Sequence, residues 1–239
     1  MKTRFIDNYE VILLDQGRTF MFENDRFGPG VDYTRTYQEL GGSTLAGDRL
    51  REVMDELVQH MFNAGRNPRS DDRFPSVSEV LHEIPVAANL NPGDISLIEE
   101  LVALHEVGSI SVGHAKAVQS LAMTHRLGIV SNIWGRKNVF ERHLEQAGIL
   151  GCFEHRIWSS DHGCIKPSPK LFLHALASFN VPPSKVLFVG DHPYRDIQAS
   201  RACGCSTVWI QNDGERFPQD CSPPDLIIPH LEDLLKVSA

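Results

Sequence analysis

"VILLDQGRTF", residues 11–20, begins with four apolar residues and then changes abruptly to a carboxylate, Asp15, followed by a turn that contains Gly17. A near-continuous apolar run is typical of a strand that is buried on both faces, as in a parallel sheet. Open α/β sheets bind their ligands at the carboxyl ends of such strands. The stretch therefore predicts a parallel sheet with a site at its carboxyl edge.

The rest of the chain repeats this pattern in alternation with helical spacing. Further apolar runs that end in polar or glycine-containing turns occupy residues 127–132, 156–160, 186–191, 207–211 and 226–229. Helical stretches are expected between them at 115–126, 139–147, 169–179 and 197–202. The β-α-β alternation predicts an α/β fold with a doubly wound parallel sheet.

One long segment interrupts the alternation directly after the first strand. Residues 21–108 contain no convincing strand, but helical spacing is present at 45–62, 76–82 and 95–106. We therefore expect a core domain formed by residues 1–20 and 109–239 and an inserted helical cap domain formed by residues 21–108. Because the insertion leaves the sheet at the carboxyl end of a strand, we expect it to cover the ligand site.

Composition limits the possible partners. The 239 residues carry a formal net charge of −8 without a long basic run, which argues against nucleic acid as a partner. No apolar stretch approaches the length of a membrane span or a signal peptide core, so we expect a cytoplasmic protein without a membrane partner. Five irregularly spaced cysteines fit a reduced compartment. The oligomeric state is left open.

Polar residues follow the predicted strands where their carboxyl ends should meet. These residues are Asp15, Ser131, Asn132, Lys166, Asp191 and Asp196. Carboxylates and oxygen ligands suit Mg²⁺, and an ammonium with a hydroxyl suits the oxygens of a phosphoryl group. The expected ligand is therefore a small phosphorylated or otherwise anionic molecule with Mg²⁺ as cofactor. Asp196 also stands directly before the predicted 197–202 helix, where it would be an N-cap.

The order of these residues resembles the motifs of the haloacid dehalogenase (HAD) superfamily. An apolar strand ends in Asp15 with Thr19 four residues later, a second strand ends in Ser131 and Asn132, Lys166 precedes "PSP", and "GD" at 190–191 is followed by Asp196. The match extends from Asp15 to about residue 210. The resemblance implies a Rossmann-like core sheet and identifies the inserted segment as a C1-type helical cap.

The resemblance also implies a role for each matching residue. Asp15 would be the nucleophile that forms a covalent aspartyl intermediate, and Lys166 a second catalytic residue. Ser131, Asn132 and Lys166 would bind the phosphoryl oxygens. Asp15, the backbone carbonyl of Gly17, Asp191 and Asp196 would hold Mg²⁺, and Thr19 would support the turn.

Gly17 departs from the pattern of the family's phosphatases. There a second Asp stands two residues after the nucleophile, protonates the leaving alcohol and activates the attacking water. General acid–base catalysis is typically worth ~10²- to 10⁴-fold in rate, so we expect an altered or weakened acid–base step. Arg18 departs as well, because the family generally has Gly at that position.

Three functions remain open at this point. The first is a Mg²⁺-dependent hydrolase, in which a cap residue, His192 or an activated substrate compensates for Gly17. The second is a catalytically impaired regulatory protein that binds phosphate and metal, and the third is a metal-independent dehalogenase-like hydrolase. A cap lysine for Schiff-base chemistry is excluded, because residues 21–108 contain no lysine. They do contain arginines able to contact an anionic substrate, namely Arg26, Arg35, Arg49, Arg51, Arg66, Arg69 and Arg73.

Overall fold

A six-stranded parallel sheet forms the centre of the computed structural model, which describes residues 4–22 and 27–236. The strand order is β3-β2-β1-β4-β5-β6, so the chain starts in the middle of the sheet and extends to both edges. Arg26 lies outside the described residues. The strands are β1 (Val11–Leu14), β2 (Arg126–Ser131), β3 (Phe153–Trp158), β4 (Val186–Gly190), β5 (Ser206–Ile210) and β6 (Leu226–Ile228).

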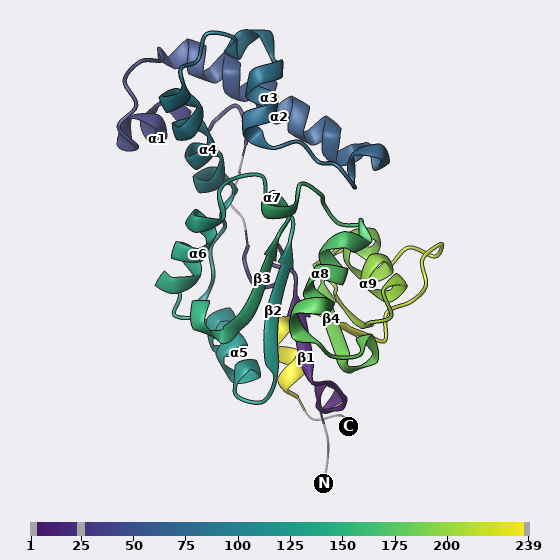
Figure 1. Ribbon diagram of the computed structural model, residues 1–239. Helices are drawn as coiled ribbons and strands as arrows, with labels where there is room; N and C mark the ends of the chain where they lie inside the picture. Colours follow the sequence, from purple (N-terminus) through teal and green to yellow (C-terminus); the bar gives the residue numbers. More distant parts are fainter. Residues whose placement is uncertain (1–3, 23–26, 237–239) are drawn as a thin grey trace.

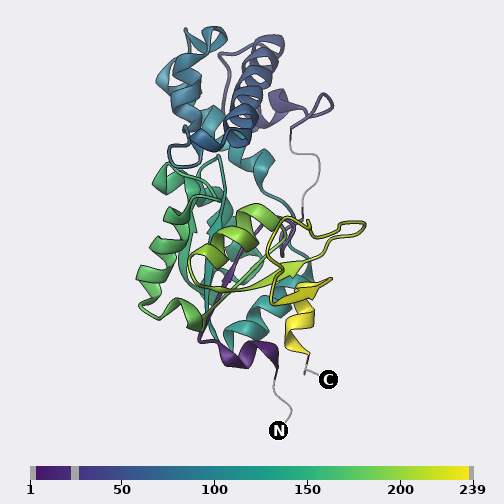
Figure 2. The same cartoon turned by 90° about the vertical axis from the view of Figure 1, so that its right-hand side faces the viewer.

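Helices cover both faces of this sheet, which confirms the predicted doubly wound α/β fold (Figures 1 and 2). Side chains of a strand alternate between its faces. In β1, Ile12 and Leu14 belong to one apolar cluster with α5 (Val112–Ala122) and α6 (Lys137–Gln146). Val11 and Leu13 belong to the opposite cluster with α8 (Pro169–Phe179) and α9 (Ala199–Ala202). All four side chains are almost completely buried, as the apolar run required.

Four helices form a separate group beyond the carboxyl ends of the strands (Figure 1). They are α1 (Tyr33–Glu39), α2 (Gly47–Arg66), α3 (Val77–Glu83) and α4 (Pro92–Glu106), and we call them the α1–α4 group. Leu50, Leu57 and Leu101 are buried in an apolar cluster of their own, which Ile165 joins from the segment after β3. The helices thus face the edge of the sheet where Asp15 lies. The division into a core and a cap domain stays a prediction.

The remaining short helices connect these elements. They are α7 (Ser159–His162), the 3₁₀ segments η1 (Phe5–Asn8), η2 (Pro68–Ser70), η3 (Pro85–Ala87), η4 (Leu150–Cys152), η5 (Pro183–Lys185) and η7 (Leu231–Leu235), and the π-helical turn η6 (Pro193–Gln198). Within the described ranges, none of the helices combines the length and the apolar character that crossing a membrane requires.

Two local predictions are corrected by the structure. The third strand was expected at residues 156–160 but spans Phe153–Trp158. It is an edge strand of the sheet, and such a strand tolerates exposed or half-buried residues, here Glu154, His155 and Arg156. Because these residues are polar, the first half of the strand does not appear as an apolar run in the sequence. The helix expected at 197–202 begins earlier, as the π-helical turn η6 that continues into α9.

Candidate active site

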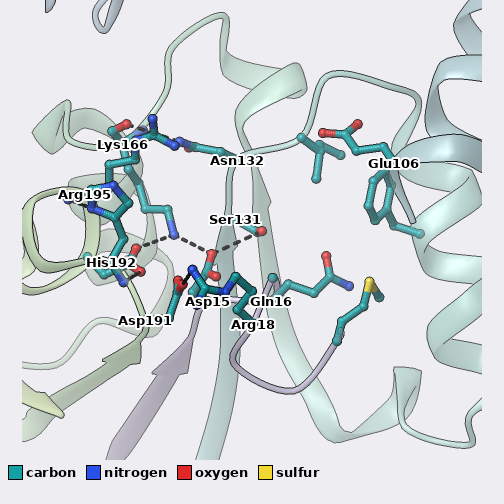
Figure 3. A pocket seen from close by; sticks show the side chains of 15 residues that line it. Asp15, Gln16, Arg18, Glu106, Ser131, Asn132, Lys166, Asp191, His192 and Arg195 are labelled. Atoms are coloured by element: carbon teal, nitrogen blue, oxygen red, sulfur yellow. Dashed lines mark hydrogen bonds and ion pairs between the residues drawn. The ribbon is translucent and has the colours of Figure 1, made fainter. Parts of the chain in front are cut away.

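Lys166 lies between two carboxylates that follow different strands of the sheet. Its ammonium donates to Oδ1 of Asp15 at 2.5 Å (Figure 3). The same ammonium donates to Oδ1 of Asp196 at 2.7 Å. Asp15 follows β1, Asp196 belongs to η6 after β4, and Lys166 follows β3 and α7. All three side chains are buried. The parallel topology therefore brings residues that are far apart in sequence into one ion-pair network at the carboxyl edge of the sheet.

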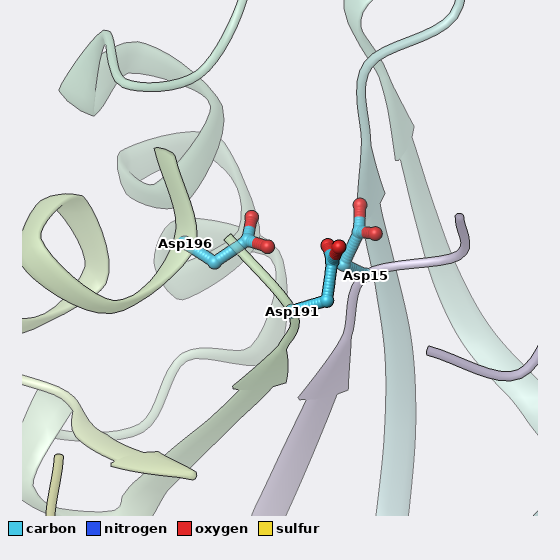
Figure 4. Close-up of side chains that lie close together, drawn as sticks. All are labelled: Asp15, Asp191 and Asp196. Atoms are coloured by element: carbon cyan, nitrogen blue, oxygen red, sulfur yellow. The ribbon is translucent and has the colours of Figure 1, made fainter. Parts of the chain in front are cut away.

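Asp191 completes a group of three carboxylates. One oxygen of each of Asp15, Asp191 and Asp196 lies within 4.8 Å of the other two, and the three side chains converge in Figure 4. Oxygen-rich groups of this kind are what Mg²⁺ prefers. The structure thus brings together the three carboxylates that the sequence predicted as metal ligands.

The electrostatics of this group indicate a shortage of positive charge. Burial raises the pKa of Asp191 to about 8, and the carboxylates of Asp196 and Asp15 add to the shift, while Arg18 and Lys166 oppose it. Burial also raises the pKa of Asp15, against the attraction of Lys166. For Lys166, burial alone would lower the pKa, but the two neighbouring carboxylates prevail and raise it. A divalent cation would relieve the repulsion among the carboxylates.

The turn after Asp15 is closed by backbone hydrogen bonds. The backbone N–H groups of Phe20 and Met21 donate to the carbonyl of Gln16, and the N–H of Arg18 donates to the carbonyl of Met21. Arg18 has a φ of 55°, in the left-handed region that favours glycine. Thr19 is fully buried within this turn, and Gly17 lines the cavity beside Asp15.

Arg18 connects this turn to Asp191. Its guanidinium Nη1 lies 3.5 Å from Oδ2 of Asp191, and Nη2 lies 2.5 Å from Oε1 of Glu215. The arginine side chain is half exposed, so water screens both interactions. Arg18 nevertheless places a cation next to a predicted metal ligand.

Ser131 and Asn132 lie beside Asp15 and Lys166 in different ways. The hydroxyl of Ser131 donates to Oδ1 of Asp15 at 3.3 Å. The amide of Asn132 bonds the backbone of Lys166 twice, accepting from its N–H at 2.8 Å and donating to its carbonyl at 3.1 Å. Asn132 therefore holds the Lys166 backbone in place, a contact that the sequence did not indicate.

The predicted N-cap role of Asp196 is wrong. His192 is the N-cap of η6, with its Nδ1 accepting from the backbone N–H groups of Tyr194 and Arg195 at 3.2 Å. Asp196 lies inside the turn, where its Oδ2 accepts from the backbone N–H of His192. Burial, Arg195 and Lys166 lower the pKa of His192 to about 4. A neutral His192 with Nδ1 as acceptor carries its hydrogen on Nε2.

These groups open into a cavity of about 270 Å³. Three of its other lining residues, Gln16, Glu106 and Arg195, were not predicted (Figure 3). Gln16 is almost fully buried, and its Nε2 has no hydrogen-bond partner among the described residues. Glu106, at the end of α4, accepts from the backbone N–H groups of Trp134 and Gly135 at 2.8–2.9 Å. Its position as the last residue of the predicted 95–106 helix was the only sequence signal, and it was too weak.

The chain is similar in sequence to known hydrolases. A model of the family described as "Haloacid dehalogenase-like hydrolase" matches residues 95–210. The chain is 41% identical over 115 residues to a glyceraldehyde 3-phosphate phosphatase of Pyrococcus abyssi, covering 47% of this chain and 48% of that protein. It is 27% identical over 143 residues to haloacetate dehalogenase H-2 of Moraxella sp., covering 60% and 61% of the two chains.

Solved structures show the same fold. The crystal structure of a HAD phosphatase from Thermococcus onnurineus superimposes with a TM-score of 0.63 at 24% identity, covering 94% of this chain and 95% of that one. Among curated relatives, by contrast, this chain spans about half the length of the phosphatases that it matches.

Proposed function

Because the chain contains a haloacid dehalogenase-like hydrolase domain, we propose that it is a Mg²⁺-dependent hydrolase of small phosphorylated molecules. The observation that carries the proposal is the convergence of Asp15, Asp191 and Asp196, two of which, Asp15 and Asp196, pair with the buried ammonium of Lys166. Homologues named as phosphatases support the same chemistry.

The donor set fits magnesium. Three carboxylates within 4.8 Å of one another, one of them with a pKa raised to about 8, form a site that a hard divalent cation would stabilise. Asp15, Asp191, Asp196 and the carbonyl of Gly17 are the groups that would hold it. A bound Mg²⁺ supplies Lewis-acid charge that attracts the phosphoryl oxygens and offsets the repulsion between phosphate and carboxylates.

Asp15 is the proposed nucleophile. A carboxylate oxygen of Asp15 attacks phosphorus and forms an acyl-phosphate bond, while the bond from phosphorus to the substrate oxygen breaks and its electron pair leaves with that oxygen. Water then attacks the phosphorus, which releases inorganic phosphate and restores the Asp15 carboxylate. Lys166 and the hydroxyl of Ser131, both in contact with Asp15, would bind the transferring oxygens, and Asn132 would position Lys166.

Proton transfer is the step that the replacement of the second Asp by Gly17 affects. Gly17 provides no acid, and the neutral imidazole of His192 has its Nδ1 occupied by two backbone N–H groups. His192 is therefore a hydrogen-bond donor through Nε2 and a poor substitute for a carboxylic acid. We propose that the enzyme acts best on substrates whose leaving group needs no proton, such as acyl phosphates or other activated esters.

A screen of phosphate esters tests this proposal. Purified protein would be assayed with acyl, aryl and alkyl phosphates, with Mg²⁺ and with EDTA, beside Asp15→Asn and the exposed control Asp213→Asn. We expect Mg²⁺-dependent release of phosphate, fastest from the activated substrates, which Asp15→Asn abolishes and Asp213→Asn retains.

The alternatives have different signatures in the same assay. Binding of Mg²⁺ or phosphate without turnover of any ester would support the regulatory protein instead. Halide release from 2-haloacids in EDTA would support the dehalogenase. Retention of phosphatase activity in Asp15→Asn would refute the assigned nucleophile.

A further inference from the structure

A second cavity of about 320 Å³ adjoins the one that contains Asp15. The two cavities share Glu106, Asn132 and Arg195 in their walls. A molecule whose phosphoryl group lies against Asp15 would therefore extend its organic part into this second cavity. The other residues that line it are Phe62, Gly65, Arg66, Trp134 and Ile165.

One side of the second cavity is apolar. Trp134 stacks on Phe27 with ring centroids 5.6 Å apart and meets Phe62 nearly perpendicularly at 4.9 Å. Ile165 is buried next to them, in the apolar cluster of the α1–α4 group. This wall suits a carbon skeleton better than a string of hydroxyl groups.

Two arginines add positive charge to the same cavity. Arg66 ends α2 and lies over the Phe62 ring, whereas Arg195 comes from η6, which follows β4. Among the residues that the structure describes, no ion pair within 4 Å is found for either arginine. The charge of Arg195 does reach Asp71, where it partly offsets the rise in pKa that burial causes. The Glu106 carboxylate is engaged by two backbone N–H groups. In a chain of net charge −8, this gathering of guanidinium groups around a cavity favours an anion.

We propose that the second cavity binds a second anionic group of the substrate, so that the substrate is a phosphate monoester with a small, partly apolar body and a distal carboxylate. This inference rests on the proposed function, because it assumes that the phosphoryl group lies against Asp15. Arg195, in the walls of both cavities, would bind the carboxylate on the side of the second cavity, away from the Asp15 group. Arg66 would bind it from α2.

Binding of two matched ligands tests the proposal. The Asp15→Asn variant, saturated with Mg²⁺, would be titrated calorimetrically with 4-carboxyphenyl phosphate and with its neutral isostere, 4-carbamoylphenyl phosphate. We expect the carboxylate to bind about tenfold more tightly, which corresponds to one charge-assisted hydrogen bond. In the same background, Arg66→Ala combined with Arg195→Ala should reduce this ratio to about one, whereas Arg69→Ala, an exposed arginine outside both cavities, should retain it.

The ratio of the two ligands' affinities separates this inference from the proposed function. Equal binding of the two ligands, or a preference that survives loss of both arginines, would overturn the distal-anion site even if the wild-type protein hydrolyses both esters. A preference for the carboxylate that depends on the arginines supports the site. Failure of both ligands to bind would overturn the phosphoryl site and this inference together.

Discussion

Lys166 and Asp15 form a buried ion pair with 2.5 Å between Nζ and Oδ1, although 151 residues separate them in the chain. The same ammonium also contacts Asp196. Because the side chains are almost fully buried, neither charge can be compensated by water if its partner is removed. The pair therefore links the stability of the fold to the electrostatics of the proposed site.

Lys166→Met should destabilise the metal-free protein strongly. Removing one partner of a buried ion pair typically costs about 3–5 kcal/mol, because it leaves an uncompensated buried charge. Chemical denaturation in EDTA would measure the loss in the free energy of unfolding. Lys170→Met is the matched control, since that ammonium contacts Asp72 on the surface and should cost less than about 1 kcal/mol.

The double variant Lys166→Met with Asp15→Asn checks the cause of this loss. Neutralising Asp15 removes one of the carboxylates left without a partner, so the double variant should be more stable than Lys166→Met alone. An equal or lower stability would show that packing of the lysine chain, and not its charge, is what matters.

His105 should make the protein less stable in mild acid. Burial lowers the pKa of His105 from the usual 6.5. The imidazole ring contacts the hydroxyl of Thr36 and lies nearly perpendicular to the ring of Tyr33. As the pH falls below 6.5, His105 becomes protonated in the unfolded chain while it remains neutral in the folded protein. The free energy of unfolding therefore decreases. The decrease amounts to at most about 1.4 kcal/mol for each pH unit between the two pKa values.

Denaturation of wild type and His105→Asn at pH 7.5 and 5.5 isolates this contribution. Other histidines with lowered pKa values, such as His143 and His162, remain in both proteins. The variant should therefore lose less stability on acidification than wild type. An identical loss in the two proteins would assign the pH dependence to other groups.

The strands that carry the site were predictable because burial on both faces leaves a plain signal in the sequence. The runs before Asp15 and Asp191 lie in the middle of the sheet and contain only apolar residues and Gly190. The edge strand β3 was placed too late, since its exposed edge admits Glu154 and Arg156. Helix α1 was missed because it is short and buries only Tyr33 and Tyr37 in its one apolar stripe.

The site was only partly predictable. Residues at strand ends could be grouped from topology alone, and the structure places Asp15, Lys166, Asp191 and Asp196 together. Arg195 and Glu106 reach the cavity from a π-helical turn and from the end of a helix in the inserted segment. Their positions depend on how η6 bends and how α4 packs on α6, which local sequence does not specify.

Gly17→Asp should provide the missing acid and base. Gly17 is not among the described glycines with positive φ, so its φ does not oppose the introduction of a side chain. With Mg²⁺, we expect kcat for alkyl phosphates to rise about 10²- to 10⁴-fold. The rise should be smaller for acyl phosphates, because their leaving group needs no proton and the new Asp helps only the attack of water on the aspartyl intermediate. Gly17→Asn controls for size. If Asn raises kcat as much as Asp does, the gain does not come from proton transfer.

Arg18→Gly should strengthen Mg²⁺ binding. The guanidinium lies 3.5 Å from Oδ2 of Asp191 and competes with a metal ion for that carboxylate. Because Arg18 is half exposed, the pair is worth at most about 1 kcal/mol, so we expect a decrease in the Kd for Mg²⁺ of several-fold, measured by calorimetry. Arg18→Met removes the same charge and should give the same decrease.

The two variants should differ in stability, which separates the charge of Arg18 from its backbone conformation. At a φ of 55°, glycine avoids the steric cost of a Cβ, which is about 1 kcal/mol for most residues. Arg18→Gly should therefore raise the free energy of unfolding by about that amount relative to Arg18→Met. Tighter Mg²⁺ binding in Arg18→Gly alone would attribute the effect to the turn, and unchanged binding in both would mean that Arg18 does not compete for Asp191.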